Sequence, residues 1–321
     1  MSEHPDGTDS RADTDSADST GVDANDASPS NELRYHVDGE LVPASRATVR
    51  VDDRGFRYGD AAFETLRAYG GTIFEWDAHA ARLEATCDAL ELTHGLSRAD
   101  LLSRIDETLS ANDLSDAYVR LSITRGVQPG KLTPDPDVDP TVVVYVGSLP
   151  RGGLEGNPVW DGPAALETVD TRRIPNDAVP ASAKTHNYLN GILARQELES
   201  GDEALLCDGE GYAAEGATSN VFFVEDGALY TPATDGPVLP GITRRVVLEC
   251  AADAGIPVEE GRYRPERLRD ADRVFLTNTT WELRPVASVD GVAIERDDRV
   301  DDDPLETLSR MYDERVEDRC Y

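Results

Sequence analysis

Residues 183–190 read Ala-Lys-Thr-His-Asn-Tyr-Leu-Asn, and they contain one of only two lysines in the chain. Arginine occurs 29 times, whereas lysine stands only at Lys131 and Lys184. Arginine supplies positive charge equally well, but it cannot be deprotonated in a protein and so cannot form an imine. The lysine kept at position 184 therefore indicates amine chemistry, namely a Schiff base with a carbonyl cofactor. The alternative is a solvated surface lysine, which an isolated lysine usually is.

The segment after Lys184 predicts a helix at Asn187–Leu198 that places Leu189, Ile192 and Leu193 on its core face. Four other segments are rich in glycine, acidic or hydroxyl residues. They read Arg-Tyr-Gly-Asp-Ala-Ala-Phe-Glu-Thr-Leu-Arg (57–67), Gly-Tyr-Ala-Ala-Glu-Gly-Ala-Thr-Ser-Asn-Val-Phe (211–222), Leu-Pro-Gly-Ile-Thr-Arg (239–244) and Leu-Thr-Asn-Thr-Thr-Trp-Glu (276–282).

In this order, the segments resemble the signature of the class IV aminotransferases. That family includes branched-chain aminotransferases, D-amino acid aminotransferases and aminodeoxychorismate lyases. The resemblance covers roughly residues 33–290 and is closest to lyase-like and branched-chain-aminotransferase-like proteins of halophilic archaea. It implies pyridoxal 5′-phosphate as cofactor and fold type IV, with a small N-terminal α/β sandwich domain and a larger C-terminal domain with a barrel-like sheet. The irregular mixture of strands and helices also favours an α+β fold over a doubly wound sheet.

The resemblance assigns most of the cofactor site. Lys184 would be the Schiff-base lysine and the proton carrier, and Glu215 would face the pyridine nitrogen and keep it protonated. Gly241-Ile242-Thr243 opens a predicted helix, whose free N–H groups suit a phosphate. The other implied contacts are Arg82, Ile242, Thr243, Thr279 and Thr280 at the phosphate, and Tyr188 at the phenolic oxygen. Two alternatives remain: a solvated acid in a glycine-rich turn for Glu215, and a core tyrosine for Tyr188.

The substrate side is also assigned by resemblance. Arg120 is expected to pair with a carboxylate through charge-assisted hydrogen bonds. Lys131, in the loop after the strand that holds Arg120, could meet an anionic substrate or be a solvated loop charge. The alternative for the strand residues is burial and exposure with period two. The substrate residues implied are Tyr58, Phe63, Arg67, Tyr118, Arg120 and Lys131.

Two reactions compete for this site. We favour an aminodeoxychorismate lyase, which releases 4-aminobenzoate for folate-type cofactors and pyruvate, because Tyr188 follows Lys184 by only four residues and Thr65 replaces the usual glycine of branched-chain enzymes. Glu64, Arg67 and the Tyr118-x-Arg120 pattern favour a branched-chain aminotransferase with 2-oxoglutarate as acceptor. A D-amino acid aminotransferase is less favoured because the Arg-x-His pattern is missing after Gly126. A non-catalytic cofactor-binding protein is disfavoured by the intact site residues.

Composition restricts the partners. The 63 acidic and 31 basic side chains give a net charge of −32, which should repel nucleic acids and anionic membranes. Acid is spread along the chain, as in proteins of salt-accumulating halophiles. Four separated cysteines, no apolar run of membrane-spanning length and no signal peptide indicate a soluble, cytoplasmic protein. Scattered histidines predict no metal site. The expected partners are a small amino substrate and, by resemblance, a second copy in a homodimer.

The chain organisation is predicted from turn and periodicity signals. We expect a disordered acidic tail (1–31), a small N-terminal domain (32–149), a linker (150–158) and a cofactor-binding C-terminal domain (159–321). A hairpin turns at Asp38-Gly39. The other predicted strands are Phe63–Tyr69, Tyr118–Thr124, Thr141–Val146, Ala204–Cys207, Asn220–Val224, Ala228–Tyr230 and Arg273–Leu276, and the other predicted helices are one capped by Asp77, Ser97–Leu109, Thr243–Ala254 and Pro304–Glu317.

Overall fold

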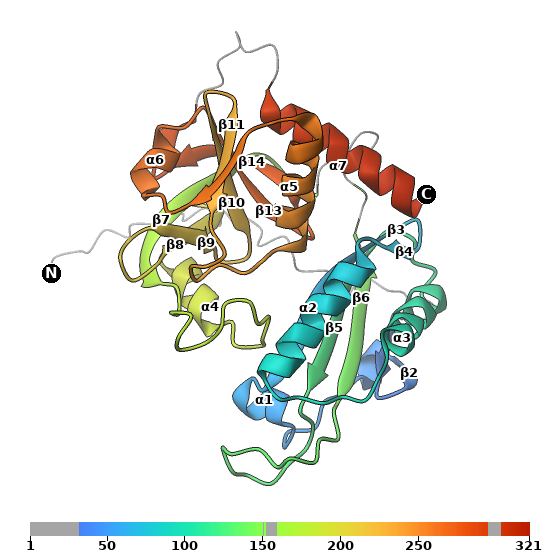
Figure 1. Ribbon diagram of the computed structural model, residues 1–321. Coiled ribbons are helices and arrows are strands. Elements are labelled where there is room, and N and C mark those ends of the chain that lie inside the picture. Colours follow the sequence, from blue (N-terminus) through green and yellow to red (C-terminus); the bar gives the residue numbers. More distant parts are fainter. Residues whose placement is uncertain (1–31, 150, 152–158, 295–302) are drawn as a thin grey trace, which may run out of the picture.

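The computed structural model describes residues 32–149, 151, 159–294 and 303–321. The predicted tail (1–31) and all but one residue of the predicted linker lie outside this part of the chain. Two β-sheets with helices packed against them form the molecule (Figure 1). The predicted α+β class is therefore confirmed, and the domain boundaries stay a prediction.

The first sheet is antiparallel and has the strand order β2-β1-β6-β5-β3-β4. The predicted hairpin is confirmed, because Asp38 and Gly39 both have the positive φ angles that its tight turn requires. Helices α2 and α3 cover one face and share an apolar core with the sheet. The strands are β1 (Arg34–Val37), β2 (Glu40–Pro43), β3 (Ala61–Tyr69), β4 (Thr72–Ile73), β5 (Ala117–Thr124) and β6 (Val142–Ser148), and the helices are the 3-10 turn η1 (Ala44–Arg46), α1 (Arg54–Tyr58), α2 (Trp76–Ala89) and α3 (Arg98–Ala111).

Helices α2 and α3 start in different ways. Helix α3 begins at Arg98, one residue after the predicted start, and Ser97 is its N-cap: the Ser97 hydroxyl accepts a hydrogen bond from the Asp100 N–H, and the Asp100 carboxylate accepts one from the Ser97 N–H. The prediction that Asp77 caps α2 is wrong, because Asp77 lies inside the first turn and Glu75 occupies the N-cap. Glu75 has a left-handed backbone and makes no side-chain cap, so its carboxylate is available for other contacts.

The second sheet is mixed and curls on itself. Its strand order is β12-β11-β10-β13-β14-β7-β8-β9, and β9 comes back beside β10, which gives the half-barrel shape. The elements are β7 (Ala164–Arg172), α4 (Leu189–Gln196), β8 (Glu203–Cys207), β9 (Ala213–Gly216), β10 (Asn220–Glu225), β11 (Ala228–Pro232), α5 (Ile242–Ala254), β12 (Val258–Gly261), α6 (Pro265–Arg269), β13 (Arg273–Asn278), β14 (Glu282–Val289), β15 (Val292–Ala293) and α7 (Pro304–Cys320).

One core joins the two halves. Tyr69 and Phe74, from the first sheet, pack with residues of α5, α7 and the second sheet. The Phe74 and Tyr312 rings lie 5.4 Å apart. Glu75 adds ion pairs to arginines of α5 and α7, including Arg315 at 2.9 Å. Helix α7 therefore fastens the N-terminal sheet to the C-terminal one.

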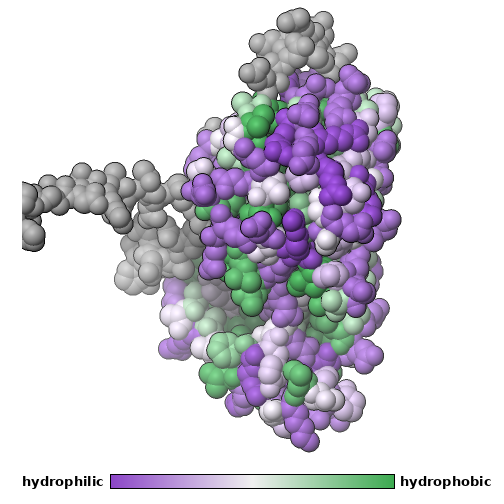
Figure 2. All heavy atoms as spheres, turned by 90° about the vertical axis from the view of Figure 1, so that its left-hand side faces the viewer, coloured by the Kyte–Doolittle hydropathy of each residue, from purple (hydrophilic) through white to green (hydrophobic). Residues whose placement is uncertain are grey.

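Helix α4 contradicts the prediction about its core face. Leu189, Ile192 and Leu193 are 65%, 52% and 47% exposed, and the helix fully buries only Ala194. The surface is largely hydrophilic, but Figure 2 shows apolar patches on the face of the molecule that it draws. The stripe that periodicity assigns to the core is therefore left on the surface of the single chain. Within the described ranges, no helix combines the length and the apolar character needed to cross a membrane.

Candidate active site

A cavity opens where the two halves meet, bounded by α2, α4, the β9–β10 turn and the start of α5. Seven of the residues that the sequence assigned to the cofactor or to catalysis line it together, although they are spread over almost 200 positions. They are Arg82, Lys184, Tyr188, Glu215, Ile242, Thr243 and Thr279. Among the described residues, no group of three or more His, Cys, Asp or Glu side chains could hold a metal ion.

Lys184 is held by the backbone of the first sheet. Its carbonyl oxygen accepts a hydrogen bond from the Phe63 N–H at 3.0 Å, and its N–H donates to the Thr86 hydroxyl at 3.0 Å. Its amine nitrogen Nζ lies 3.1 Å from the Tyr188 hydroxyl and 4.6 Å from the centre of the Phe63 ring. The partly exposed Tyr188 thus faces the lysine and the cavity, which disfavours the core-tyrosine alternative.

Glu215 lies at one end of the cavity and is buried. Its oxygen Oε1 pairs with Arg173 at 2.7 Å, and Oε2 accepts hydrogen bonds from the Leu239 N–H at 2.9 Å and the Asn220 amide at 3.3 Å. Burial raises the pKa of Glu215, and the positive charges of Arg173 and Lys184 oppose that rise. The alternative of a solvated acid does not describe this carboxylate.

The other end of the cavity is built to hold an anion. Gly241 supplies no side-chain cap to α5, so the N–H groups of the first turn point free toward the cavity beside Thr243. A Cβ atom at Gly241 would lie 2.0 Å from the Asn220 side-chain oxygen, so only glycine permits this approach. Arg82 is fixed at the same end, because it donates to the Pro240 carbonyl at 3.0 Å.

Arg82 is oriented by a buried acid. Glu64 accepts two hydrogen bonds from the guanidinium, at 2.8 and 2.6 Å, and a third contact from His79 at 2.8 Å. Burial alone would raise the pKa of Glu64, but Arg82 and His79 outweigh it and lower the pKa to about 2. Glu64 thus stays ionised and aims Arg82 at the α5 end of the cavity.

The residues present fit pyridoxal phosphate. The Thr277 hydroxyl lines the cavity, is buried, and has no hydrogen-bond partner in the described part of the chain. An uncapped helix and Arg82 suit a phosphate at one end, and Glu215 suits a protonated ring nitrogen at the other. Lys184 lies between these ends and carries the primary amine that binds an aldehyde. When bound there, the cofactor supplies an electron sink for the substrate's α-carbon.

Of the two threonines that were predicted to contact the phosphate from the loop after β13, only one lines the cavity. Thr279 lines the cavity, but Thr280 does not; its hydroxyl donates to the Asn278 side chain at 3.0 Å. Arg67 is also not in the cavity lining and is only 1% exposed. Its guanidinium donates to the Thr280 carbonyl at 3.2 Å and pairs with Glu282 at 2.7 Å. Arg67 therefore lies outside the cavity of this chain and fastens this loop to the first sheet, and the substrate role expected for it stays a prediction.

The face of the first sheet opposite α2 and α3 carries the expected substrate residues Phe63, Tyr118 and Arg120. Phe63, Thr65 and Arg67 alternate on β3, and Thr65 lies opposite Arg120 in the register with β5. The Arg120 guanidinium stacks on the Phe63 ring at 3.7 Å. Tyr118 lies on the same face and meets Tyr145 edge-on at 6.0 Å. Phe63, which contacts Lys184, thus joins this face to the reactive amine.

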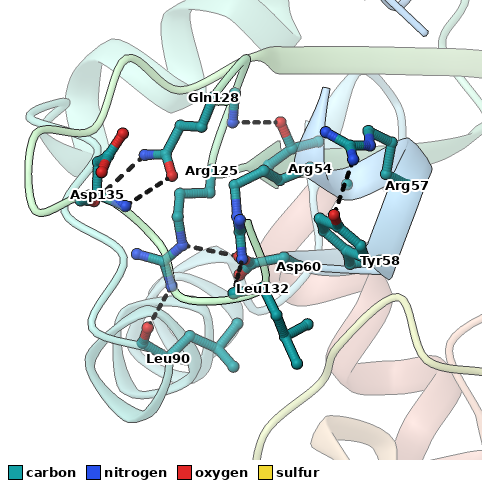
Figure 3. Close-up of polar contacts among 12 residues, drawn as sticks. Arg54, Arg57, Tyr58, Asp60, Leu90, Arg125, Gln128, Leu132 and Asp135 are labelled. Atoms are coloured by element: carbon teal, nitrogen blue, oxygen red, sulfur yellow. Dashed lines mark hydrogen bonds and ion pairs between the residues drawn. The ribbon is translucent and has the colours of Figure 1, made fainter. Parts of the chain in front are cut away.

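Tyr58, in α1 just before β3, and Lys131, in the loop after β5, belong to segments at the ends of these strands; Figure 3 shows Tyr58 there. The loop of residues 125–140 is held by Arg54, which donates to the carbonyls of Lys131 and Leu132 at 2.7 and 2.8 Å. Asp60 accepts from Arg54 and Arg125, and these two guanidinium groups hold its pKa below the usual range although burial opposes them. Tyr58 accepts a hydrogen bond from Arg57 at 2.8 Å. Neither Tyr58 nor Lys131 lines the cavity of its own chain.

Sequence reasoning missed three residues of the site: Arg173, Asn220 and the orienting role of Glu64. Glu64 and Asn220 stood inside the quoted motifs, so their position was available but their contacts were not. Arg173 directly follows β7, a strand that was not predicted. Its only signal in the sequence is the Arg172-Arg173 pair in a strongly acidic chain.

Comparison with known proteins agrees with this geometry. The family model for amino-transferase class IV matches residues 61–289. A protein of Methanocaldococcus jannaschii that carries the name branched-chain-amino-acid aminotransferase is 37% identical, over 82% of this chain and 90% of the relative. The D-alanine aminotransferase of Listeria innocua is 34% identical over 82% of this chain and 89% of its own. The aminodeoxychorismate lyase of Bacillus subtilis is 33% identical, with 80% and 87% covered.

Solved structures share the whole architecture. The branched-chain aminotransferase of Thermoproteus uzoniensis, solved with norvaline, superimposes with a TM-score of 0.79 at 28% identity, covering 88% of this chain and 93% of that one. Another structural neighbour with this name contains pyridoxamine 5′-phosphate. A half-barrel sheet with a lysine, a buried acid and an anion-binding helix start defines an enzyme of the pyridoxal-phosphate class. The chain belongs to the class IV aminotransferases, which have fold type IV.

Proposed function

We propose that this enzyme uses its pyridoxal 5′-phosphate cofactor as an aminodeoxychorismate lyase. It would convert 4-amino-4-deoxychorismate to 4-aminobenzoate and pyruvate through the amine of Lys184. The observation that carries the proposal is the position of Thr65. This threonine shares a strand face with Phe63, whose ring contacts Lys184, and lies opposite Arg120.

Thr65 and Arg120 supply what a lyase needs at this place. The substrate carries a carboxylate on its ring and a second one on the pyruvate-forming side chain. The Arg120 guanidinium can pair with a carboxylate, and the Thr65 hydroxyl can donate to an oxygen of the departing pyruvate. The side chain of a branched-chain amino acid has no oxygen that could accept a hydrogen bond from this hydroxyl. The resemblance to the Bacillus subtilis lyase supports the same interpretation.

The second candidate is a branched-chain aminotransferase. The resemblance to the Methanocaldococcus jannaschii protein and to the Thermoproteus uzoniensis enzyme supports it, as does the sheet face that carries Tyr118 and Arg120. The relatives named as D-alanine aminotransferases are nearly as similar, but the loop after Gly126 reads Val-Gln-Pro-Gly-Lys and lacks an Arg-x-His carboxylate site. We therefore rank D-amino acid transamination below the other two reactions.

The two leading reactions differ in what they do with the amino group. A lyase regenerates the Lys184 adduct in each cycle, so we expect many turnovers of 4-amino-4-deoxychorismate in molar KCl without any keto acid. The measurement is 4-aminobenzoate and pyruvate, which should appear in equal amounts. Thr65→Val should lower this rate about tenfold or more, because it removes a hydrogen bond to the reacting group while keeping the shape. Thr65→Ser, the matched control, should keep most of it.

The opposite outcome is equally clear. If valine with 2-oxoglutarate is consumed rapidly and no 4-aminobenzoate forms, the enzyme is a branched-chain aminotransferase. The assignments of Lys184 and of the cofactor would be unaffected by that result.

We also propose that the enzyme works as a homodimer. The candidate interface, the α1–α4 apolar face, consists of Val51, Phe56, Leu132, Leu189, Ile192 and Leu193, all of them exposed. Its segments are neighbours, because Arg54 of α1 binds the Leu132 carbonyl and Asn187 donates to the carbonyl of Gly59 at the end of α1. Residues at the start of α4, including Asn190 and Gly191, line the cavity. A second copy on this face would cover the apolar side chains and stand beside the cavity.

A single charged substitution in this face tests the proposed dimer. Ile192→Asp should place a carboxylate in the covered apolar face and convert the dimer to a monomer, as measured by light scattering after gel filtration. Val292→Asp, on the exposed β14–β15 hairpin, is the matched control and should leave the mass unchanged. A dimer that tolerates Ile192→Asp would exclude this interface.

A further inference from the structure

Arg173 lines the cavity and pairs with Glu215, but no role in the reaction has been given to it so far. It directly follows β7, and its backbone N–H donates to the Cys207 carbonyl on β8 at 2.9 Å. The side chain is held on three sides. One guanidinium nitrogen pairs with Glu215 at 2.7 Å, a second donates to the Asn190 side chain at 3.3 Å, and Nε donates to the Pro237 carbonyl at 3.3 Å.

These contacts come from three different parts of the second half: β9, α4 and the loop before α5. A flexible surface arginine would not be fixed in this way, and four-fifths of the Arg173 side chain is buried. The guanidinium is therefore aimed at one oxygen of Glu215. The other oxygen is occupied by the Leu239 N–H and the Asn220 amide. The carboxylate has its plane fixed and both oxygens bonded before any ligand arrives.

Two positively charged side chains act on the Glu215 carboxylate. Arg173 contacts it directly, and Lys184 faces it from across the cavity; both favour the ionised carboxylate. The contacts from Asn220 and Leu239 are uncharged hydrogen bonds. Burial works against ionisation. Without Arg173, a buried Glu215 would therefore keep its proton to a higher pH.

We propose that Arg173 is a positioning residue for the reaction: it orients Glu215 and keeps it ionised, so that this carboxylate can pair with the protonated ring nitrogen of the cofactor. The inference deepens the proposed function and rests on its use of the cofactor. It does not depend on the choice between lyase and aminotransferase, because both reactions withdraw electrons into the same ring. Arg173 itself touches no reacting atom in this role.

The experiment compares three variants. Arg173→Gln removes the charge and keeps a hydrogen-bonding side chain, Arg173→Lys keeps the charge but loses the fork-shaped fit, and Arg172→Gln is the matched control. Arg172 is the exposed neighbour and does not line the cavity. The first measurement needs no cofactor and no substrate: the protein is labelled with ¹³C at the glutamate carboxyl carbons and titrated by NMR. The Glu215 signal is assigned by its loss in Glu215→Gln.

In Arg173→Gln, the Glu215 signal should titrate at a clearly higher pH than in the unmodified protein, in Arg173→Lys at a pH between the two, and in Arg172→Gln at the unmodified pH. The second measurement is the pH profile of kcat for the holoenzyme. Because the working form needs ionised Glu215, kcat of Arg173→Gln should fall about tenfold or more between pH 9 and pH 6. At pH 9 it should return to within about threefold of the unmodified enzyme.

Two results would overturn the proposal. One is an unchanged Glu215 titration with kcat lowered equally at every pH, which would make Arg173 a purely structural residue. The other is no change in either measurement. If Arg173→Gln does not fold, as judged by circular dichroism, the Glu215 titration in Arg173→Lys takes its place: a shift to higher pH supports the proposal, and no shift contradicts it. Failure of the proposed function shows itself elsewhere, as the absence of a cofactor adduct, and leaves the NMR titration readable.

Discussion

Replacing Lys184 with alanine is expected to lower turnover by at least about four orders of magnitude. The loss is large because this amine would form the covalent link to the cofactor and carry the proton at the substrate's α-carbon. The backbone contacts of residue 184 to Phe63 and Thr86 do not involve the amine, so the fold should survive. The measurement is turnover, together with the yellow colour of the bound cofactor, which should be lost.

The chain offers an unusually clean control for this prediction, because Lys131 is its only other lysine. Borohydride reduction followed by peptide mass mapping should place one adduct on Lys184 in the unmodified protein and in Lys131→Arg. Lys184→Ala should give no adduct. Mapping of the adduct to Lys131, or its persistence in Lys184→Ala, would show that the site has been assigned to the wrong amine.

The second large effect concerns Glu215→Gln. Glutamine has nearly the same shape and can still accept a hydrogen bond from Arg173 or Leu239, but it carries no charge to keep the ring nitrogen protonated. We expect kcat to fall by at least about 100-fold, which corresponds to about 2.7 kcal/mol in activation free energy. The cofactor should stay bound, because the contacts at Arg82 and at the start of α5 lie at the other end of the cavity. Stopped-flow turnover and equilibrium dialysis of the cofactor separate the two effects.

Glu210→Gln provides the comparison for that experiment. Glu210 lies in the turn between β8 and β9, directly before the strand that holds Glu215, and its side chain is 71% exposed. The Glu210→Gln enzyme should turn over at the rate of the unmodified enzyme. If Glu215→Gln behaves in the same way as Glu210→Gln, then the charge at position 215 has no role in the reaction.

The sequence predicted the site more fully than the packing around it. Residues that the motifs contain, such as Lys184, Glu215 and Thr243, do line one cavity, because each motif carries both a local turn and its functional side chain. Strands with a clear apolar run, such as β3 and β10, were also predicted. Strands β7, β9 and β14 were not, since their polar residues and glycine hide the alternation that marks a half-buried strand.

The features that the sequence could not predict share one physical cause, namely contacts between distant parts of the chain. Arg67 has the same neighbours in sequence whether it faces a substrate or, as here, Glu282 across 215 positions. The apolar stripe of α4 has helical periodicity in either case, and periodicity cannot say whether a core or another surface covers it. No local sequence pattern marks Arg173 as a site residue, because its contacts are with Glu215, 42 positions later, and with Asn190.

The pairing of the Lys184 segment with β3 has a consequence for how the protein is made. Thr185 bridges to Ala62, so the reactive lysine is placed by a strand that leaves the ribosome more than 100 residues earlier. Bringing such distant segments together costs loop-closure entropy, and this cost is offset only when the long-range contacts themselves have formed. The phosphate-binding helix start and the loop after β13 are synthesised later still. The complete cofactor site therefore cannot form before the chain has been synthesised as far as the loop after β13.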